Sequence, residues 1–152
     1  MNTEYAKRHE ENDFNLLIEL NSKFKLKDLG RMKDGHDTDA SGYTQDDRYI
    51  EIELKRRYIN VDTYKTIIIE PYKMQYAKQH QDIIQLYVNF TDDDYAIVFN
   101  LHHVKNPNKN VYNIPSKLYE RTKPSNRYEL PVEQAWIYKK INGKYKLIQK
   151  GW

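Results

Sequence analysis

The sequence predicts an α/β or α+β domain built on a central mixed β-sheet flanked by helices. Three observations favour this fold class. A helical periodicity opens the chain, alternating strand-like runs follow it, and a second, short helical segment separates two groups of strands. The chain has 152 residues, the length of one ordinary domain. We therefore expect a single domain over residues 1–152.

The first half of the chain begins with a helix, because Phe14, Leu17 and Ile18 share one face and no Gly or Pro interrupts the pattern. Glycines and charges indicate a loop further on, and apolar alternation indicates strands. In chain order we expect a helix at 4–24, a short strand at 24–26, a loop at 29–35, an acidic segment at 36–42 and a strand at 49–57.

In the second half, Pro71 is typical of the first turn of a helix, and Asn142-Gly143 is typical of a tight hairpin turn. Prolines interrupt the stretch between about 104 and 134, which therefore carries no clear pattern. We expect a strand at 64–69, a helix at 70–78, strands at 83–90 and 95–101, and a hairpin of strands at 135–140 and 144–149.

The composition bounds the class of protein. Apolar residues make up 39% of the chain and charged residues 31%, and no stretch approaches the ~20 apolar residues of a membrane span. The N-terminus is polar, without the apolar region of a signal peptide. Cysteine is absent, which fits a reducing compartment. We therefore expect a cytoplasmic protein without a membrane partner.

The net charge is only +3, but basic residues gather between positions 105 and 127. Glu120 is the single acid there, among Lys105, Lys109, Lys117, Arg121, Lys123 and Arg127. Such a segment suits a phosphate backbone, and it is equally typical of a solvated surface loop. The 14 tyrosines are compatible with nucleic-acid stacking and with half-buried strands alike.

The strand expected at 49–57 carries the clearest chemical pattern. Because side chains alternate between the faces of a strand, Glu51, Glu53, Lys55 and Arg57 share one face. A carboxylate here, with a second one from a neighbouring strand, can hold a hard cation such as Mg²⁺. The cation lowers the pKa of a bound water, and a nearby lysine orients that water or stabilises developing negative charge.

The second carboxylate is expected just upstream, on a strand paired with this one. Asp37 and Asp39 are both available, and Asp39 precedes Glu53 at hairpin distance. The simpler interpretation is a charged solvent face on an edge strand, because a Glu-x-Lys triplet arises easily in a chain this rich in both residues.

The stretch from Asp39 through a turn to the apolar strand with Glu53-x-Lys55 resembles the core of the PD-(D/E)XK nuclease superfamily. That superfamily includes restriction endonucleases, Holliday junction resolvases and many small phage nucleases. The resemblance covers residues 5 to 101 roughly. It implies a restriction-endonuclease-like αβββαβ core, followed here by a C-terminal β-rich extension at about 104–152.

The resemblance also implies roles for individual residues. Asp39 and Glu53 would be metal ligands and Lys55 the catalytic lysine. Family members often add a glutamate from the first helix, for which Glu11 is our choice and Glu10 the alternative. Arg57, just beyond the lysine, and Lys73, at the start of the next helix, would contact substrate. The proline that often precedes the aspartate is Thr38 here, and Asp37 competes with Asp39.

We therefore expect a Mg²⁺-dependent deoxyribonuclease, an endonuclease in which Mn²⁺ substitutes for Mg²⁺ and DNA is the partner. Nucleases that cut both strands are often dimers, so a homodimer is an alternative to a monomer. Two other hypotheses stay open. One is a non-catalytic nucleic-acid-binding protein of the same fold, and the other is an interaction protein such as a phage accessory factor.

Overall fold

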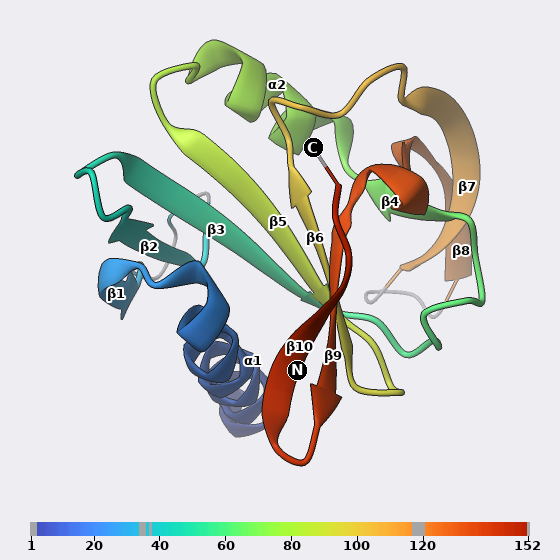
Figure 1. Ribbon diagram of the computed structural model, residues 1–152. Coiled ribbons are helices and arrows are strands. Elements are labelled where there is room, and N and C mark those ends of the chain that lie inside the picture. The colour runs from blue at the N-terminus through green and yellow to red at the C-terminus, as the bar shows by residue number, and fades with distance from the viewer. Residues whose placement is uncertain (1–2, 34–35, 37, 117–120, 152) are drawn as a thin grey trace.

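Two β-sheets and two α-helices make up the part of the chain that the computed structural model describes, residues 3–33, 36, 38–116 and 121–151 (Figure 1). The larger sheet has seven strands, in the order β1-β2-β3-β5-β6-β9-β10. Its strands are β1 (Lys27–Arg31), β2 (Ala40–Tyr43), β3 (Tyr49–Arg56), β5 (Ile84–Phe90), β6 (Tyr95–Asn100), β9 (Trp136–Ile141) and β10 (Lys144–Gln149).

The smaller sheet has three strands, in the order β4-β8-β7. They are β4 (Thr66–Ile69), β7 (Asn108–Ser116) and β8 (Arg121–Pro131). The helices are α1 (Thr3–Phe24) and α2 (Pro71–Gln79), and a 3-10 turn, η1 (Val132–Gln134), leads into β9. Within these residues no helix is long and apolar enough to cross a membrane.

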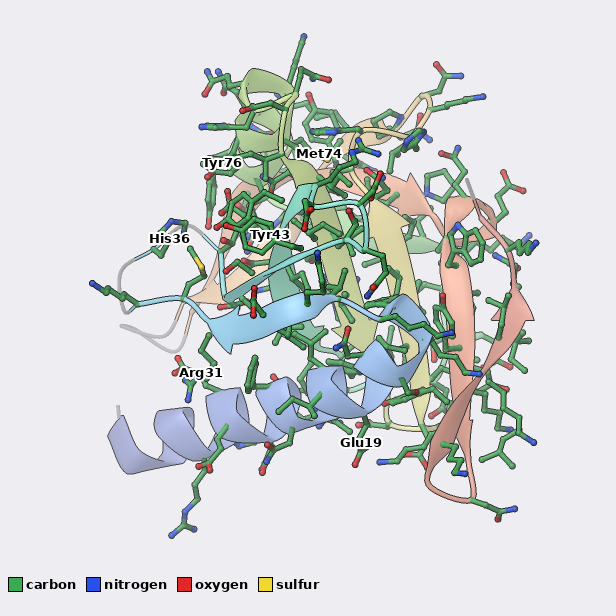
Figure 2. All side chains as sticks on the ribbon, turned by 60° about the vertical axis from the view of Figure 1, so that its left-hand side comes forward. Glu19, Arg31, His36, Tyr43, Met74 and Tyr76 are labelled. Carbon is green, nitrogen blue, oxygen red and sulfur yellow. The ribbon has the colours of Figure 1, made fainter. Side chains whose placement is uncertain are left out.

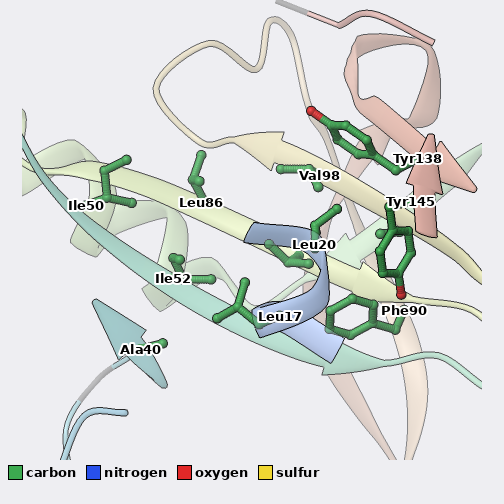
Figure 3. Packing of buried hydrophobic residues seen from close by; sticks show 12 residues of the cluster. Leu17, Leu20, Ala40, Ile50, Ile52, Leu86, Phe90, Val98, Tyr138 and Tyr145 are labelled. Atoms are coloured by element: carbon green, nitrogen blue, oxygen red, sulfur yellow. The ribbon is translucent and has the colours of Figure 1, made fainter. Parts of the chain in front are cut away.

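The two helices cover opposite faces of the seven-stranded sheet (Figure 1). Leu17 and Leu20 of α1 are fully buried against one face, where they meet Ile52, Leu86 and other strand residues (Figure 3). On the other face the core consists of residues from α2, the smaller sheet and the alternate strand positions: Ile67, Ile69, Ala77, Tyr87, Ile97, Phe99 and Leu130. The central strands are therefore buried on both faces, which explains their nearly continuous apolar sequence.

The connectivity gives the larger sheet its mixed character. β3 and β5 run parallel, joined by a crossover that contains α2, and the remaining neighbours in this sheet pair antiparallel. With β4 assigned to the smaller sheet, the order α1, β1, β2, β3, α2, β5 is the predicted αβββαβ core. The predicted fold class is confirmed, including the β-rich C-terminal extension, which supplies β7 to β10.

Two parts of the chain differ from the prediction. The first is β1, which forms at 27–31 where the sequence indicates a strand at 24–26 and a loop at 29–35. Its register against β2 is irregular between Lys27 and Gly30, and Asp28 has a φ of 52°. A bulged edge strand of this kind breaks the alternation on which the sequence prediction depends.

The second difference is the long pair β7 and β8, in a stretch without a clear sequence pattern. Pro124 lies opposite Asn113 in this pair. β4 pairs only with residues 128–131 of β8, so no third strand needs the hydrogen bond that Pro124 lacks. The hairpin β9–β10 is as predicted, with Asn142 at φ 52° and Gly143 at φ 77°, the left-handed conformations of a tight two-residue turn.

Candidate functional site

Strand β3 presents its charged residues to the face that α2 covers, as the alternation predicts. Glu51 is buried and accepts a hydrogen bond from Tyr76 of α2, with 3.0 Å between the hydroxyl oxygen and Oε1. Glu53 pairs with Lys73 of α2. The Nζ of Lys55 lies 3.8 Å from Oε1 of Glu70, the residue before α2. The apolar alternates of β3 pack on the α1 side instead.

Asp39 lies opposite Glu53, immediately before β2. The pairing of Ala40 with Ile52 sets this register, and the Asp39 amide donates to the Ile52 carbonyl at 3.0 Å. The Oδ2 of Asp39 accepts a hydrogen bond from the Leu54 amide at 2.7 Å, which fixes the carboxylate beside β3. The structure therefore brings Asp39 and Glu53 together. Asp37, the competing acid, lies outside the described residues.

The environment of Glu53 disfavours its negative charge. Burial is the largest cause that raises its pKa, the nearby Asp39 carboxylate raises it further, and Lys73 only partly offsets the two. Burial would lower the pKa of Lys73, but the carboxylates of Glu53 and Glu70 outweigh burial and raise it. The Asp39 carboxylate thus adds to the cost of charging Glu53, and Lys73 and Lys55 reduce that cost without cancelling it.

Lys55 experiences the opposite balance. Burial is the main cause that lowers its pKa, and the positive charge of Lys73 lowers it further, although Glu70 acts against both. A lysine with a lowered pKa is closer to giving up its proton at neutral pH than an exposed lysine is. Such a group is suited to proton transfer or to stabilising developing negative charge.

Glu70 links these lysines, and the sequence patterns assign it no role. It is the N-cap residue of α2, and its carboxylate lies 3.4 Å from Lys73 and 3.8 Å from Lys55. Burial would raise its pKa, but the two lysines and its backbone hydrogen bond lower it. Glu53, Lys73, Glu70 and Lys55 thus form a chain of alternating charges, which we name the ion-pair chain. A Glu directly before a helix-opening proline is the signal that points to Glu70.

Among the acids of α1, Glu10 and Asp13 line the same pocket as Asp39, and the catalytic role expected of Glu11 stays a prediction. Glu11 is exposed, and Glu10 pairs with Arg31 at 3.3 Å, an arginine that extends from β1 toward α1 (Figure 2). Asp13 is mostly buried and lines a pocket of about 250 Å³ together with Asp39. Burial raises the pKa of Asp13, the nearby Arg56 acts against this, and Asp39 adds a small rise.

Helical geometry explains why Asp13, and not Glu11, faces the sheet. Positions 13, 17 and 20 fall on one face of a helix, and Leu17 and Leu20 are fully buried. An acid four residues before a buried leucine is carried toward the sheet, and Glu11 lies off that face. The buried stripe of α1 is the sequence signal that identifies Asp13.

Comparison with known proteins found no matching family model and no matching curated protein. Among solved structures, the chain is similar to Hjc of Archaeoglobus fulgidus, described as a Holliday junction resolvase from an archaeal hyperthermophile. The two share 9% sequence identity over 80% of this chain and 87% of that chain, with a TM-score of 0.49. A likeness at this level does not assign a function to this chain.

Arg57 makes its contacts inside the protein. Its guanidinium donates to the Ile68 carbonyl at 2.7 Å, to Oδ1 of Asn89 at 3.0 Å and to the Tyr87 hydroxyl. These hydrogen bonds tie the end of β3 to β4 and β5. A contact between Arg57 and substrate stays a prediction.

The donor set fits one class of metal site. Among the residues that the structure describes, no group of three or more His, Cys, Asp or Glu residues is arranged to hold a metal ion. Mg²⁺ is commonly held by only one or two carboxylates, with waters and substrate phosphates as its other ligands. Asp39, directly before β2, and Glu53 of β3 supply two carboxylates, so the residues present fit a Mg²⁺ site of that open kind.

Proposed function

We propose that the chain is a single-domain, Mg²⁺-dependent endonuclease that hydrolyses DNA phosphodiester bonds. The observation that carries this proposal is the register that sets Asp39 opposite Glu53, with Lys55 two residues further on the same face as Glu53. This is the acid–acid–lysine arrangement of the PD-(D/E)XK pattern. When bound, the cation would supply an acidified water and positive charge for the phosphate.

In this proposal, Asp39 and Glu53 hold the cation, and Lys55 stabilises the negative charge that develops on the phosphate. Lys73 neutralises Glu53 in the absence of a cation. If Glu53 held a cation, the Lys73 ammonium would be available to contact the scissile phosphate. Asp13 takes the place that the resemblance suggests for Glu11.

Several finer points stay predictions. The preference for DNA over RNA, the replacement of Mg²⁺ by Mn²⁺ and a homodimeric state all follow from the sequence resemblance alone. The absence of cysteine supports the proposed cytoplasmic location.

The alternative is a non-catalytic nucleic-acid-binding or phage accessory protein with a nuclease-like fold. The ion-pair chain favours it, because Glu53 and Lys55 already have partners of opposite charge within the protein. Such a protein would keep these residues to stabilise the packing of α2 on the sheet, and it would bind no divalent cation at Asp39.

Plasmid cleavage with Mg²⁺ or Mn²⁺ tests the proposal. We expect the wild type to cut, and Glu53→Ala and Lys55→Ala to lose activity about a hundredfold or more. Lys78→Ala is the matched control, because Lys78 is exposed on α2 outside the ion-pair chain. If the wild type and all three variants behave alike, the catalytic assignment is wrong. Calorimetry with Mn²⁺ on Asp39→Ala then separates a metal-binding protein from one that binds no cation.

A further inference from the structure

A pocket of about 290 Å³ adjoins the ion-pair chain between α2 and the sheet. Glu53 and Lys73 line it, together with the aromatic residues Tyr72 and Tyr76 of α2 and with Gln85 of β5. The proposed site of phosphodiester cleavage and this pocket therefore share two side chains. Whatever occupies the pocket lies next to the bond that would be cut.

Gln85 is the feature of this pocket that lacks an explanation within the protein. Its side chain is only 3% exposed, and its Nε2 has no hydrogen-bond partner in the described part of the chain. Burial of an amide N–H group without an acceptor is unfavourable, because water satisfies that group in the unfolded chain. Leucine would fill the same volume without this cost, so an unpaired glutamine indicates a ligand with an acceptor atom.

The neighbouring polar groups do not serve as that acceptor. Glu51 lies beside Gln85 in the parallel register of β3 and β5. Its carboxylate instead accepts hydrogen bonds from the Thr38 hydroxyl at 2.6 Å and from the Tyr76 hydroxyl at 3.0 Å. The Nε2 of Gln85 therefore has no acceptor, whereas the neighbouring Glu51 carboxylate is hydrogen-bonded to Thr38 and Tyr76.

Two tyrosines add flat aromatic surface to the pocket. Tyr72 is 60% exposed. Tyr76 is held in place by its hydrogen bond to Glu51 and by stacking on His80, with 4.0 Å between the ring centroids. Aromatic faces of this kind stack on nucleobases, and a buried amide N–H group can donate a hydrogen bond to an acceptor on the edge of a base.

We infer that this pocket binds one nucleobase of the cleaved strand, next to the scissile phosphate, an inference that rests on the proposed nuclease function. Gln85 Nε2 donates to a carbonyl oxygen or ring nitrogen on the edge of the base, and Tyr72 provides the stacking surface. A base in this position is unstacked and unpaired, because the pocket encloses the edge that pairing would use. The substrate class is therefore single-stranded or locally unpaired nucleic acid.

Titration of the ¹⁵N-labelled protein with the four deoxynucleosides, in EDTA, tests the pocket without metal, phosphate or cleavage. We expect the Gln85 side-chain amide signals to shift at millimolar concentrations of at least one nucleoside. Gln85→Leu should weaken that binding about tenfold. The same variant should raise the midpoint of thermal unfolding, because it removes an unpaired buried donor. Gln45→Leu, at an exposed turn, is the matched control for both measurements.

Tyr72→Ala provides a second, surface-exposed variant, and it should also weaken nucleoside binding. Tyr58→Ala is its control, because Tyr58 is 70% exposed and lies outside the pocket. Unchanged Gln85 amide signals, or equal affinity in Gln85→Leu and the wild type, would overturn the inference. An active nuclease with a negative titration contradicts the base pocket alone. An inactive protein with a positive titration contradicts the nuclease proposal and leaves the nucleobase site.

Discussion

Lys73 of α2 pairs with Glu53 of β3, the carboxylate that faces Asp39 across the β2–β3 register. The ammonium group thus neutralises Glu53, one of the two acids that we propose as cation ligands. Only 11% of the Lys73 side chain and 15% of the Glu53 side chain are exposed, so neither charge is fully solvated by water. Metal binding and this ion pair should therefore compete.

Lys73→Met tests that competition. Removal of one partner leaves a mostly buried, unpaired carboxylate, so in EDTA the variant should lose about 3 kcal/mol of the free energy of unfolding. Mn²⁺ should restore most of that loss and should bind the variant more tightly than the wild type. Thermal unfolding with and without Mn²⁺ measures both effects, with Lys78→Met on the exposed side of α2 as control. A variant that Mn²⁺ does not stabilise would contradict a cation site at Glu53.

Lys55→Met should stabilise the protein while it abolishes cleavage. The pKa of Lys55 is lowered in the folded chain, mainly by burial, so its charged form is disfavoured there relative to the unfolded chain. This cost to stability is fully present below the lowered pKa, and it is relieved as pH rises from that value toward the ordinary 10.5. At neutral pH the methionine variant should gain about 1 kcal/mol at most, because the Lys55 side chain is 36% exposed and water screens part of this cost.

Urea unfolding of the wild type and Lys55→Met at several pH values measures this difference. The advantage of the variant should shrink at alkaline pH, where the wild type no longer has to bury a charge. An advantage that is independent of pH would mean that the charge of Lys55 is not its cause.

Simple periodicity predicts the central part of the site. Strict alternation over Tyr49–Arg56 fixes which residues share the charged face, and hairpin distance brings Asp39 to Glu53. These are local relations within one strand pair, so the sequence is sufficient for them.

The residues that were missed depend on packing between distant elements. Asp13 reaches Asp39 because α1 lies on the sheet with Leu17 and Leu20 inward, and Glu70 joins the two lysines because α2 crosses over β3. The strands β7 and β8 were missed because prolines hide their pairing. Long-range docking of this kind leaves little trace in the spacing of residues along one element.

Arg57→Met should destabilise the protein even if Arg57 never contacts substrate. Its guanidinium donates to the Ile68 carbonyl and to Asn89, which join β3 to β4 and β5. Loss of these hydrogen bonds should cost about 2 kcal/mol of the free energy of unfolding, because the Oδ1 of the fully buried Asn89 loses its donor, although the Ile68 carbonyl keeps the Tyr87 hydroxyl at 3.1 Å. Chemical denaturation measures the loss, and Arg48→Met, on an exposed turn, is the control. Unchanged stability would favour a role for Arg57 at the protein surface.

Asp13→Asn and Glu11→Gln decide which acid of α1 belongs to the site. Asp13 shares a pocket with Asp39, whose carboxylate raises the pKa of Asp13, whereas Glu11 is exposed. We expect Asp13→Asn to slow Mg²⁺-dependent plasmid cleavage about tenfold or more, and Glu11→Gln to leave it unchanged. Asp13 also lies 3.3 Å from Arg56, so thermal unfolding of both variants has to accompany the assay. If Asp13→Asn keeps its folded stability and loses activity, the carboxylate acts at the site. If Glu11→Gln is the impaired variant, Glu11 is the acid of the site, as the PD-(D/E)XK resemblance implies, and our inference of Asp13 from the packing of α1 is wrong.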